Sequence, residues 1–150
     1  MGNAHPSIAP YEVFETMDQP IIIAVGNDAQ FKRLCHTLGL VDLSDDPRFV
    51  SNSNRVSNRQ NLVHHINSAL KARSSQQWFD LLTAAGIPCG PINTIGQAFE
   101  LATNLGLDPL RNGQVSNPLT MSGTPITRYQ NPPQLGQHND EIIEQLNLDG

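Results

Sequence analysis

The sequence predicts an α+β fold in which a small antiparallel sheet is accompanied by several helices. The first observation is a short, β-branched apolar run at residues 21–25, which is typical of a buried strand. The second is an upstream strand segment containing Tyr11, Val13 and Phe14, joined to this run through residues 17–20 as a β-hairpin. The third is a series of amphipathic helical segments that begins directly after the run.

The hairpin is preceded by an arm and followed by a loop. Residues 5–10 contain two prolines and are predicted to be extended. Gly26, Asn27 and Asp28 then connect the second strand to a helix over residues 29–38, because these residue types tolerate positive φ and cap helices. The junction exposes backbone N–H groups that suit an anion or a carboxylate. A plain strand-to-helix turn has the same spacing, so both interpretations remain open.

The helical patterns continue along the chain in order. The first helix has an apolar face and ends at Gly39; the face consists of Phe31, Leu34, Cys35 and Leu38. Residues 42–58 are polar and are predicted to be a loop with a helical turn, and residues 62–70 form an amphipathic helix. The next helix begins at a capping box of Ser74 and Gln77 and ends at Gly86. Its predicted inward residues are Trp78, Leu81, Leu82 and Ala85.

The remainder is less regular. Residues 87–91 are predicted to be a rigid extended crossing, and a second capping box opens a short helix after it, with Thr94 and Gln97 as its two members. Weak strand patterns occur at residues 114–115 and 126–129. A last helix is predicted after Asn139, with two acidic residues, Asp140 and Glu141, favourably placed in its first turn.

Composition excludes several classes of function. The 150 residues carry a net charge of −5 with only nine Lys and Arg, which argues against nucleic-acid binding. No apolar run approaches the roughly 20 residues of a membrane helix, and no signal peptide is visible, so a cytoplasmic protein is expected. Cys35 and Cys89 are expected to be reduced, and the neighbouring His64 and His65 lack the spacing of a metal pair, so no metal site is predicted. Only 15% of the residues are charged, which indicates that part of the surface meets another chain or domain.

Six short motifs occur in an order that resembles the family III CoA-transferases, a group that includes formyl-CoA transferase, carnitine CoA-transferase and α-methylacyl-CoA racemase. The resemblance runs from about residue 5 to residue 146. The motifs are HPSIAPY at 5–11, AVGNDAQF at 24–31, DPRF at 46–49, RVSNR at 55–59, GIPCGPIN at 86–93 and PPQLGQH at 132–138.

The resemblance implies a partial enzyme. Family members have a large Rossmann-like domain and a small α+β domain, and two protomers interlock. This sequence would supply a linker arm at residues 1–16, the small domain at 17–115, and a Pro-rich return segment with the last helix at 116–150. The large domain, and with it the aspartate that attacks the acyl-CoA thioester, is expected to come from elsewhere. Coenzyme A thioester is then a substrate, and no bound cofactor is expected.

The resemblance also marks candidate site residues. A small-domain loop shields acyl intermediates from water in the transferases, and its position matches Gly26, Asn27, Asp28, Ala29 and Gln30. Asp28 is the candidate catalytic residue, by comparison with proton transfer in the racemase branch; helix capping is the alternative.

The basic group of the chain is a second set of candidates, namely Arg48, Arg55 and Arg59. These residues are candidates for binding CoA phosphates or a substrate carboxylate. The alternative is that they tie the polar loop to Asp45, Asp46 or a partner subunit.

Two functions follow. In the first, the chain is the small-domain part of a CoA-transferase and is inactive by itself. In the second, it is a free-standing, non-catalytic binding or interaction module that is derived from such an enzyme and is expected to be a homo-oligomer.

Overall fold

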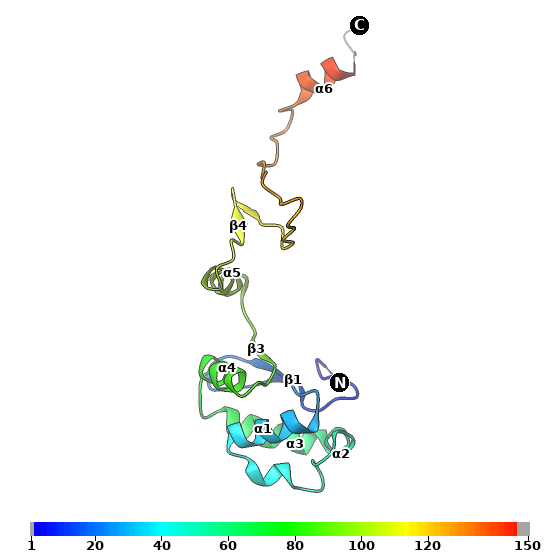
Figure 1. Cartoon of the computed structure of the whole chain (residues 1–150), viewed down its shortest axis with the longest axis vertical. Coiled ribbons are helices and arrows are strands. Elements are labelled where there is room, and N and C mark those ends of the chain that lie inside the picture. Colours follow the sequence, from blue (N-terminus) through cyan, green and yellow to red (C-terminus); the bar gives the residue numbers. More distant parts are fainter. Residues whose placement is uncertain (1, 147–150) are drawn as a thin grey trace. The chain divides into compact units, whose positions relative to one another are not determined.

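The computed structural model describes residues 2–146, and these divide into two compact units, Met1–Ile92 and Asn93–Gly150 as far as each is described. Figure 1 shows the helices and strands of each unit, coloured along the sequence. The first unit contains β1 (Tyr11–Phe14), β2 (Ile21–Ala24), α1 (Asp28–Leu38), the 3-10 helix η1 (Val41–Ser44), α2 (Asn52–Ser57), α3 (Arg59–Leu70), α4 (Ser75–Ala84) and β3 (Cys89–Pro91). The second contains α5 (Ile95–Asn104), β4 (Leu110–Arg111), β5 (Gln114–Val115) and α6 (Asn139–Gln145). The α+β class is confirmed.

A three-stranded antiparallel sheet in the order β1-β2-β3 forms the centre of the first unit. The predicted hairpin is confirmed, with Tyr11 opposite Ala24 and Phe14 opposite Ile21. The predicted extended crossing at residues 87–91 contributes a third strand, in which Gly90 lies opposite Ile22. Because proline has no N–H to donate, a strand that ends in Pro91 and follows Pro88 is suited only to a sheet edge, and β3 lies at an edge of the sheet.

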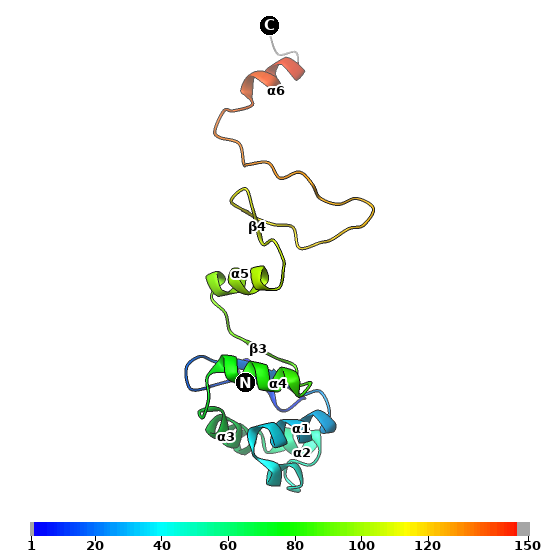
Figure 2. The ribbon, with the colours of Figure 1, turned by 60° about the vertical axis from the view of Figure 1, so that its left-hand side comes forward.

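One hydrophobic core lies between this sheet and the helices of the first unit. Alternate residues of the second strand segment, Ile21, Ile23 and Val25, are buried, as the two-residue period of a strand requires. Helices α1 and α3 lie side by side below the sheet in both views (Figure 1, Figure 2). They contribute the buried residues Phe31, Leu34, Cys35, Leu38, Leu62, Ile66 and Leu70.

The predicted helices of the first unit are confirmed, with two differences. Gly39 ends α1 in the left-handed conformation at φ 72°, as predicted. The polar loop contains η1 and α2 rather than a single turn. The capping box of Ser74 and Gln77 is present at the start of α4. The prediction that Leu81 points inward is wrong, because this residue is 40% exposed and α4 buries Trp78 and Leu82 instead.

Both helices predicted in the second unit are confirmed, and so is one of its two predicted strands. Thr94 and Gln97 form the predicted capping box of α5. The strand predicted at residues 114–115 is β5, and it pairs with β4, which the patterns missed. The strand predicted at residues 126–129 is wrong, because this segment makes side-chain contacts instead of a ladder. In it, the Tyr129 carbonyl accepts from Asn112 Nδ2 at 3.0 Å.

Asp18 joins the β1–β2 turn to the start of α4. Its Oδ1 accepts from the backbone N–H of Ser75 at 2.7 Å and of Gln19 at 2.8 Å, and these hydrogen bonds hold the pKa of Asp18 below its usual range. A folded-state pKa below the unfolded value makes the stabilisation full above about pH 4 and removes it as the pH falls through the folded-state pKa.

We therefore expect Asp18→Asn to be less stable than the wild-type chain at pH 7, by a difference that shrinks as the pH falls toward 2. Urea unfolding from pH 7 to pH 2 measures the difference between the two proteins. A difference that stays constant over this range would show that the charge of Asp18 contributes nothing.

Candidate functional site

The predicted loop lies where β2 enters α1. Val25 is buried and donates its N–H to the carbonyl of Pro10 at 2.9 Å, and the next four residues are exposed. Asn27 caps the helix, because its Oδ1 accepts from the Gln30 N–H at 2.9 Å. Capping by Asp28 is therefore wrong: Asp28 is the first residue of α1. The expected use of positive φ is also wrong for this loop, since Asn27 is extended at φ −153°.

Gly26 and Gln30 close the loop on itself. The Gly26 N–H donates to Gln30 Oε1 at 2.7 Å. A Cβ added at Gly26 would lie 3.4 Å from the same oxygen, which is the end of a flexible side chain. The first turn of α1 leaves the N–H groups of Asp28 and Ala29 without intrahelical acceptors. The loop thus presents an exposed backbone with available donors beside a side chain that can move.

Asp28 is bound by one of the candidate arginines. Its Oδ1 accepts from Arg55 Nη2 at 2.7 Å. The two side chains differ in exposure, since that of Asp28 is 57% exposed and that of Arg55 is 0% exposed. The carboxylate therefore lies at the surface while its partner cation lies inside the core. Asp28 and Arg55 are 27 residues apart in sequence, and no local pattern connects them.

Every side of the Arg55 guanidinium is occupied by protein. Nε donates to the Ala9 carbonyl at 2.7 Å and Nη1 to the Phe49 carbonyl at 3.0 Å. The guanidinium carbon lies 4.4 Å from the centre of the Phe31 ring, at a distance typical of a cation–π contact. Arg55 thus ties the arm, the polar loop and α1 together, and it has no surface left for a ligand.

The other two candidate arginines have separate partners. Arg48 Nη2 lies 2.7 Å from Asp46 Oδ2, and the hydrogen bonds from Arg48 hold the pKa of Asp46 below its usual range. Arg59 Nη1 lies 3.0 Å from Glu12 Oε1, and its Nη2 donates to the carbonyls of the arm. Arg48 keeps a side chain that is about half exposed, so it is the member of the group with most access to a ligand.

Neither cysteine of the chain is activated. Burial raises the pKa of Cys35 to about 11, and burial also raises the pKa of Cys89. A thiol with a raised pKa forms little thiolate and is a poor nucleophile near neutral pH. Within residues 2–146, no group of three or more His, Cys, Asp or Glu side chains is gathered to hold a metal ion.

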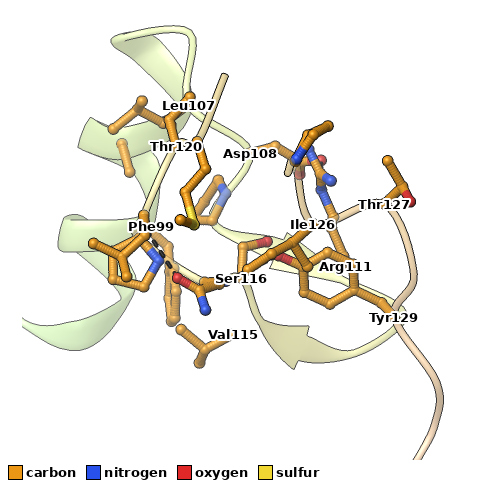
Figure 3. A pocket seen from close by; sticks show the side chains of 17 residues that line it. Phe99, Leu107, Asp108, Arg111, Val115, Ser116, Thr120, Ile126, Thr127 and Tyr129 are labelled. Carbon is orange, nitrogen blue, oxygen red and sulfur yellow. Dashed lines mark hydrogen bonds and ion pairs between the residues drawn. The ribbon is translucent and has the colours of Figure 1, made fainter. Parts of the chain in front are cut away.

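A pocket of about 610 Å³ in the second unit was missed by the sequence patterns. Figure 3 shows Phe99 on the α5 side and Tyr129 with Arg111 on the other side. The guanidinium carbon of Arg111 lies 5.3 Å from the centre of the Tyr129 ring, and Arg111 Nε lies 2.8 Å from Asp108 Oδ2. The other walls are mainly apolar, and they come from a segment that has no regular periodicity.

Comparison with known sequences decides the family. The sequence model of CoA-transferase family III matches residues 1–139. The chain belongs to this family. The resemblance inferred from the six motifs is therefore confirmed.

Relatives in this family have assigned activities. The chain is 40% identical to the succinate–glutarate CoA-transferase of Agrobacterium fabrum, over 97% of the chain and 39% of that protein. It is 35% identical to the succinyl-CoA:glutarate CoA-transferase of Mus musculus, over 97% of the chain and 35% of that protein. The family III chain thus spans about two fifths or less of the length of these relatives, and corresponds to a portion of such an enzyme.

Solved structures agree with the fold. A CAIB/BAIF family protein from Brucella suis is 35% identical and matches with a TM-score of 0.81, over 97% of this chain and 40% of that one. Rv3272 from M. tuberculosis is 26% identical and matches with a TM-score of 0.77, over 89% and 38%. Among residues 2–146, no helix of this family III chain has both the length and the apolar character needed to cross a membrane.

Proposed function

We propose that the chain is the small-domain portion of a family III CoA-transferase, and that its β2–α1 loop covers an acyl-transfer centre whose attacking carboxylate is supplied by other residues of the enzyme. The observation that carries this is the exposed, self-closed loop at Gly26–Gln30 in a chain that matches the family over residues 1–139. Covalent acyl intermediates divide CoA exchange into two easier steps, provided that water is excluded.

The proposed substrates are dicarboxylic acids and their CoA thioesters. This rests on the relatives, because succinate and glutarate are the acids in the names of the Agrobacterium and mouse proteins. In the reaction, an enzyme carboxylate attacks the thioester carbonyl and displaces CoA thiolate, which forms a mixed anhydride. The acceptor carboxylate then replaces the first acid, and attack of the CoA thiolate on the acceptor's acyl carbon gives the new thioester and frees the enzyme carboxylate. The chain would enclose the reacting carbonyl. Arg48 is its candidate for binding a CoA phosphate or a substrate carboxylate, because the Arg48 side chain is about half exposed.

Asp28 is better accounted for as an anchor than as the attacking or proton-transferring group. Its Oδ1 is held by a guanidinium that has no exposure to solvent. A carboxylate engaged in this way neutralises a buried charge, and its departure toward a substrate would leave that charge unpaired. We therefore assign the covalent step to a residue outside this chain.

The proposed partners are the large part of the enzyme and a second protomer. The support comes from the second unit, which exposes many large apolar side chains. A fully solvated surface normally carries fewer of them, and an excess marks an interaction surface. These include Leu105, Leu107, Val115, Leu119, Met121 and Leu135.

A chimera tests the proposed function. Residues 1–139 replace the matching segment of the Agrobacterium enzyme, and CoA transfer from succinyl-CoA to glutarate is measured beside the unmodified enzyme and the 150-residue chain alone. We expect turnover by the chimera and none by the chain alone. A folded chimera without transfer, including one that only binds acyl-CoA, would favour the binding-module alternative. Turnover by the chain alone would refute the external attacking group.

In the active chimera, Gly26→Val is expected to raise thioester hydrolysis relative to transfer about tenfold, which corresponds to roughly 1.4 kcal/mol of lost discrimination against water. A Cβ at this position lies 3.4 Å from Gln30 Oε1, so the added methyl groups are expected to crowd the acceptor of the loop's closing hydrogen bond and weaken that bond. Hydrolysis and transfer are measured together by following both acids. Gly96→Val is the control, because a Cβ at Gly96 meets no atom within 4 Å. An unchanged ratio in Gly26→Val would contradict a shielding role.

A further inference from the structure

One buried side chain joins the N-terminal arm, residues 5–10, to the β2–α1 loop, residues 26–30. Arg55 Nε binds the Ala9 carbonyl in the arm at 2.7 Å, and Arg55 Nη2 binds Asp28 in the loop at 2.7 Å. The two segments precede and follow the β1–β2 hairpin in sequence, and two nitrogens of the same guanidinium bind them.

The link through Arg55 is stiff because the guanidinium is rigid and is held by further contacts. The guanidinium is planar, so its N–H groups have fixed directions relative to one another. The Phe49 carbonyl holds a third position and the Phe31 ring lies 4.4 Å from the guanidinium carbon. Since Arg55 is fully buried, the loss of one partner leaves a charge that its remaining contacts compensate only in part. A shift of Ala9 therefore moves the group that holds Asp28.

We propose that Arg55 is a positioning residue that sets the β2–α1 loop according to the place of the N-terminal arm. The proposal rests on the proposed function, in which this loop covers the acyl-transfer centre. Displacement of the arm would then release Asp28, loosen the first turn of α1 and admit water to the centre.

Two other contacts allow the proposal to be tested. Asn52 binds the arm independently of Arg55, because its Oδ1 accepts from the Ala9 N–H at 3.1 Å and its Nδ2 donates to the Ser7 carbonyl at 2.8 Å. Asn52→Ala therefore loosens the arm without removing a contact of the loop. The hydrogen bond from Val25 to Pro10 is a second route between the same segments. The experiment must separate this route from Arg55.

Hydrogen exchange of the 150-residue chain distinguishes the route through Arg55 from the route through Val25 and Pro10. We expect Asn52→Ala to raise the exchange rates of the Gly26 and Gln30 amides, two loop amides that have hydrogen-bond acceptors, at least fivefold. We expect Arg55→Met to raise them as well, and Asn52→Ala added to Arg55→Met to raise them no further. Arg33→Met is the matched control, because Arg33 also donates to backbone carbonyls, those of Ala85 and Gly86, but contacts neither segment through them. It should change the loop rates less than twofold.

Two results would overturn the proposal. In one, Asn52→Ala raises exchange in the arm but not in the loop. In the other, its effect on the loop persists in Arg55→Met, which would assign the coupling to Val25 and Pro10. If Arg55→Met does not fold, Asp28→Ala serves as the background, since it cuts the loop end of the same link. The chimera assay fails or succeeds separately: coupled exchange without CoA transfer would refute the proposed function and leave the role of Arg55 supported.

Discussion

Asp28→Ala is expected to lower the free energy of unfolding of the first unit by about 3 kcal/mol, because it leaves a buried cation without its partner. Arg55 is 0% exposed, and Asp28 is the carboxylate bound to it. The other two bonds of the guanidinium go to neutral carbonyls, which compensate a full charge only in part. Asp28→Asn should cost about 1 kcal/mol, since the amide oxygen still accepts the hydrogen bond.

Urea unfolding followed by the fluorescence of Trp78 measures this effect, because Trp78 is the single tryptophan of the chain and belongs to the core of the first unit. Asp80→Ala is the matched control: its carboxylate is exposed and accepts from the Gln76 side chain. Its effect should stay within about 0.5 kcal/mol. Equal losses from Asp28→Ala and Asp80→Ala would show that Arg55 does not depend on Asp28.

Trp78→Ala is expected to lower the free energy of unfolding by about 4 kcal/mol, through lost burial and the cavity left behind. The indole is 4% exposed, and its Nε1 donates to the Leu70 carbonyl at 2.7 Å, which fixes α4 against the end of α3. Far-UV circular dichroism in urea measures the change without the tryptophan signal.

Leu81→Ala is the control for this second substitution. Leu81 lies on the same helix and is 40% exposed, so its truncation should cost less than about 1 kcal/mol. A large loss from Leu81→Ala with a small one from Trp78→Ala would reverse the assignment of the buried face of α4.

The elements that were predicted correctly depend on short-range patterns. The hairpin follows from the β-branched run of β2 and its polar turn, and both capping boxes follow from residues three positions apart. In each case, the residues that determine the conformation lie within about one turn or one loop of each other.

The two strands that the sequence patterns missed differ in cause: β3 depends on a partner strand, and β4 does not. Residues 89–91 are a strand because β2 offers a free edge, and their own composition of cysteine, glycine and proline does not favour one. The strand β4 has a local signal in the sequence, since Asn112 and Gly113, at φ 50° and 72°, form the kind of Asn-Gly turn that joins two strands. The error at Leu81 has another cause, since helical spacing identifies an apolar stripe but not which edge of it meets the core.

The candidate loop could be located from the sequence, but its anchoring could not. The apolar run followed by Gly26 and Asn27 indicates a strand-to-helix junction, and the order of the motifs indicates the family. Nothing near Asp28 identifies Arg55 as its partner, and the pocket in the second unit is lined by residues without periodicity.

The sequence by itself determined the local elements, their order and the membership of CoA-transferase family III, because propensity, capping and motif order are properties of neighbouring residues. Only the tertiary structure decided that Arg55 is buried and joins the arm to the loop, whereas Arg48 stays about half exposed beside Asp46. The physical reason is that the environment of a charge is set by the segments that fold around it. Those segments, at Ala9, Asp28 and Phe49, meet only when the core forms.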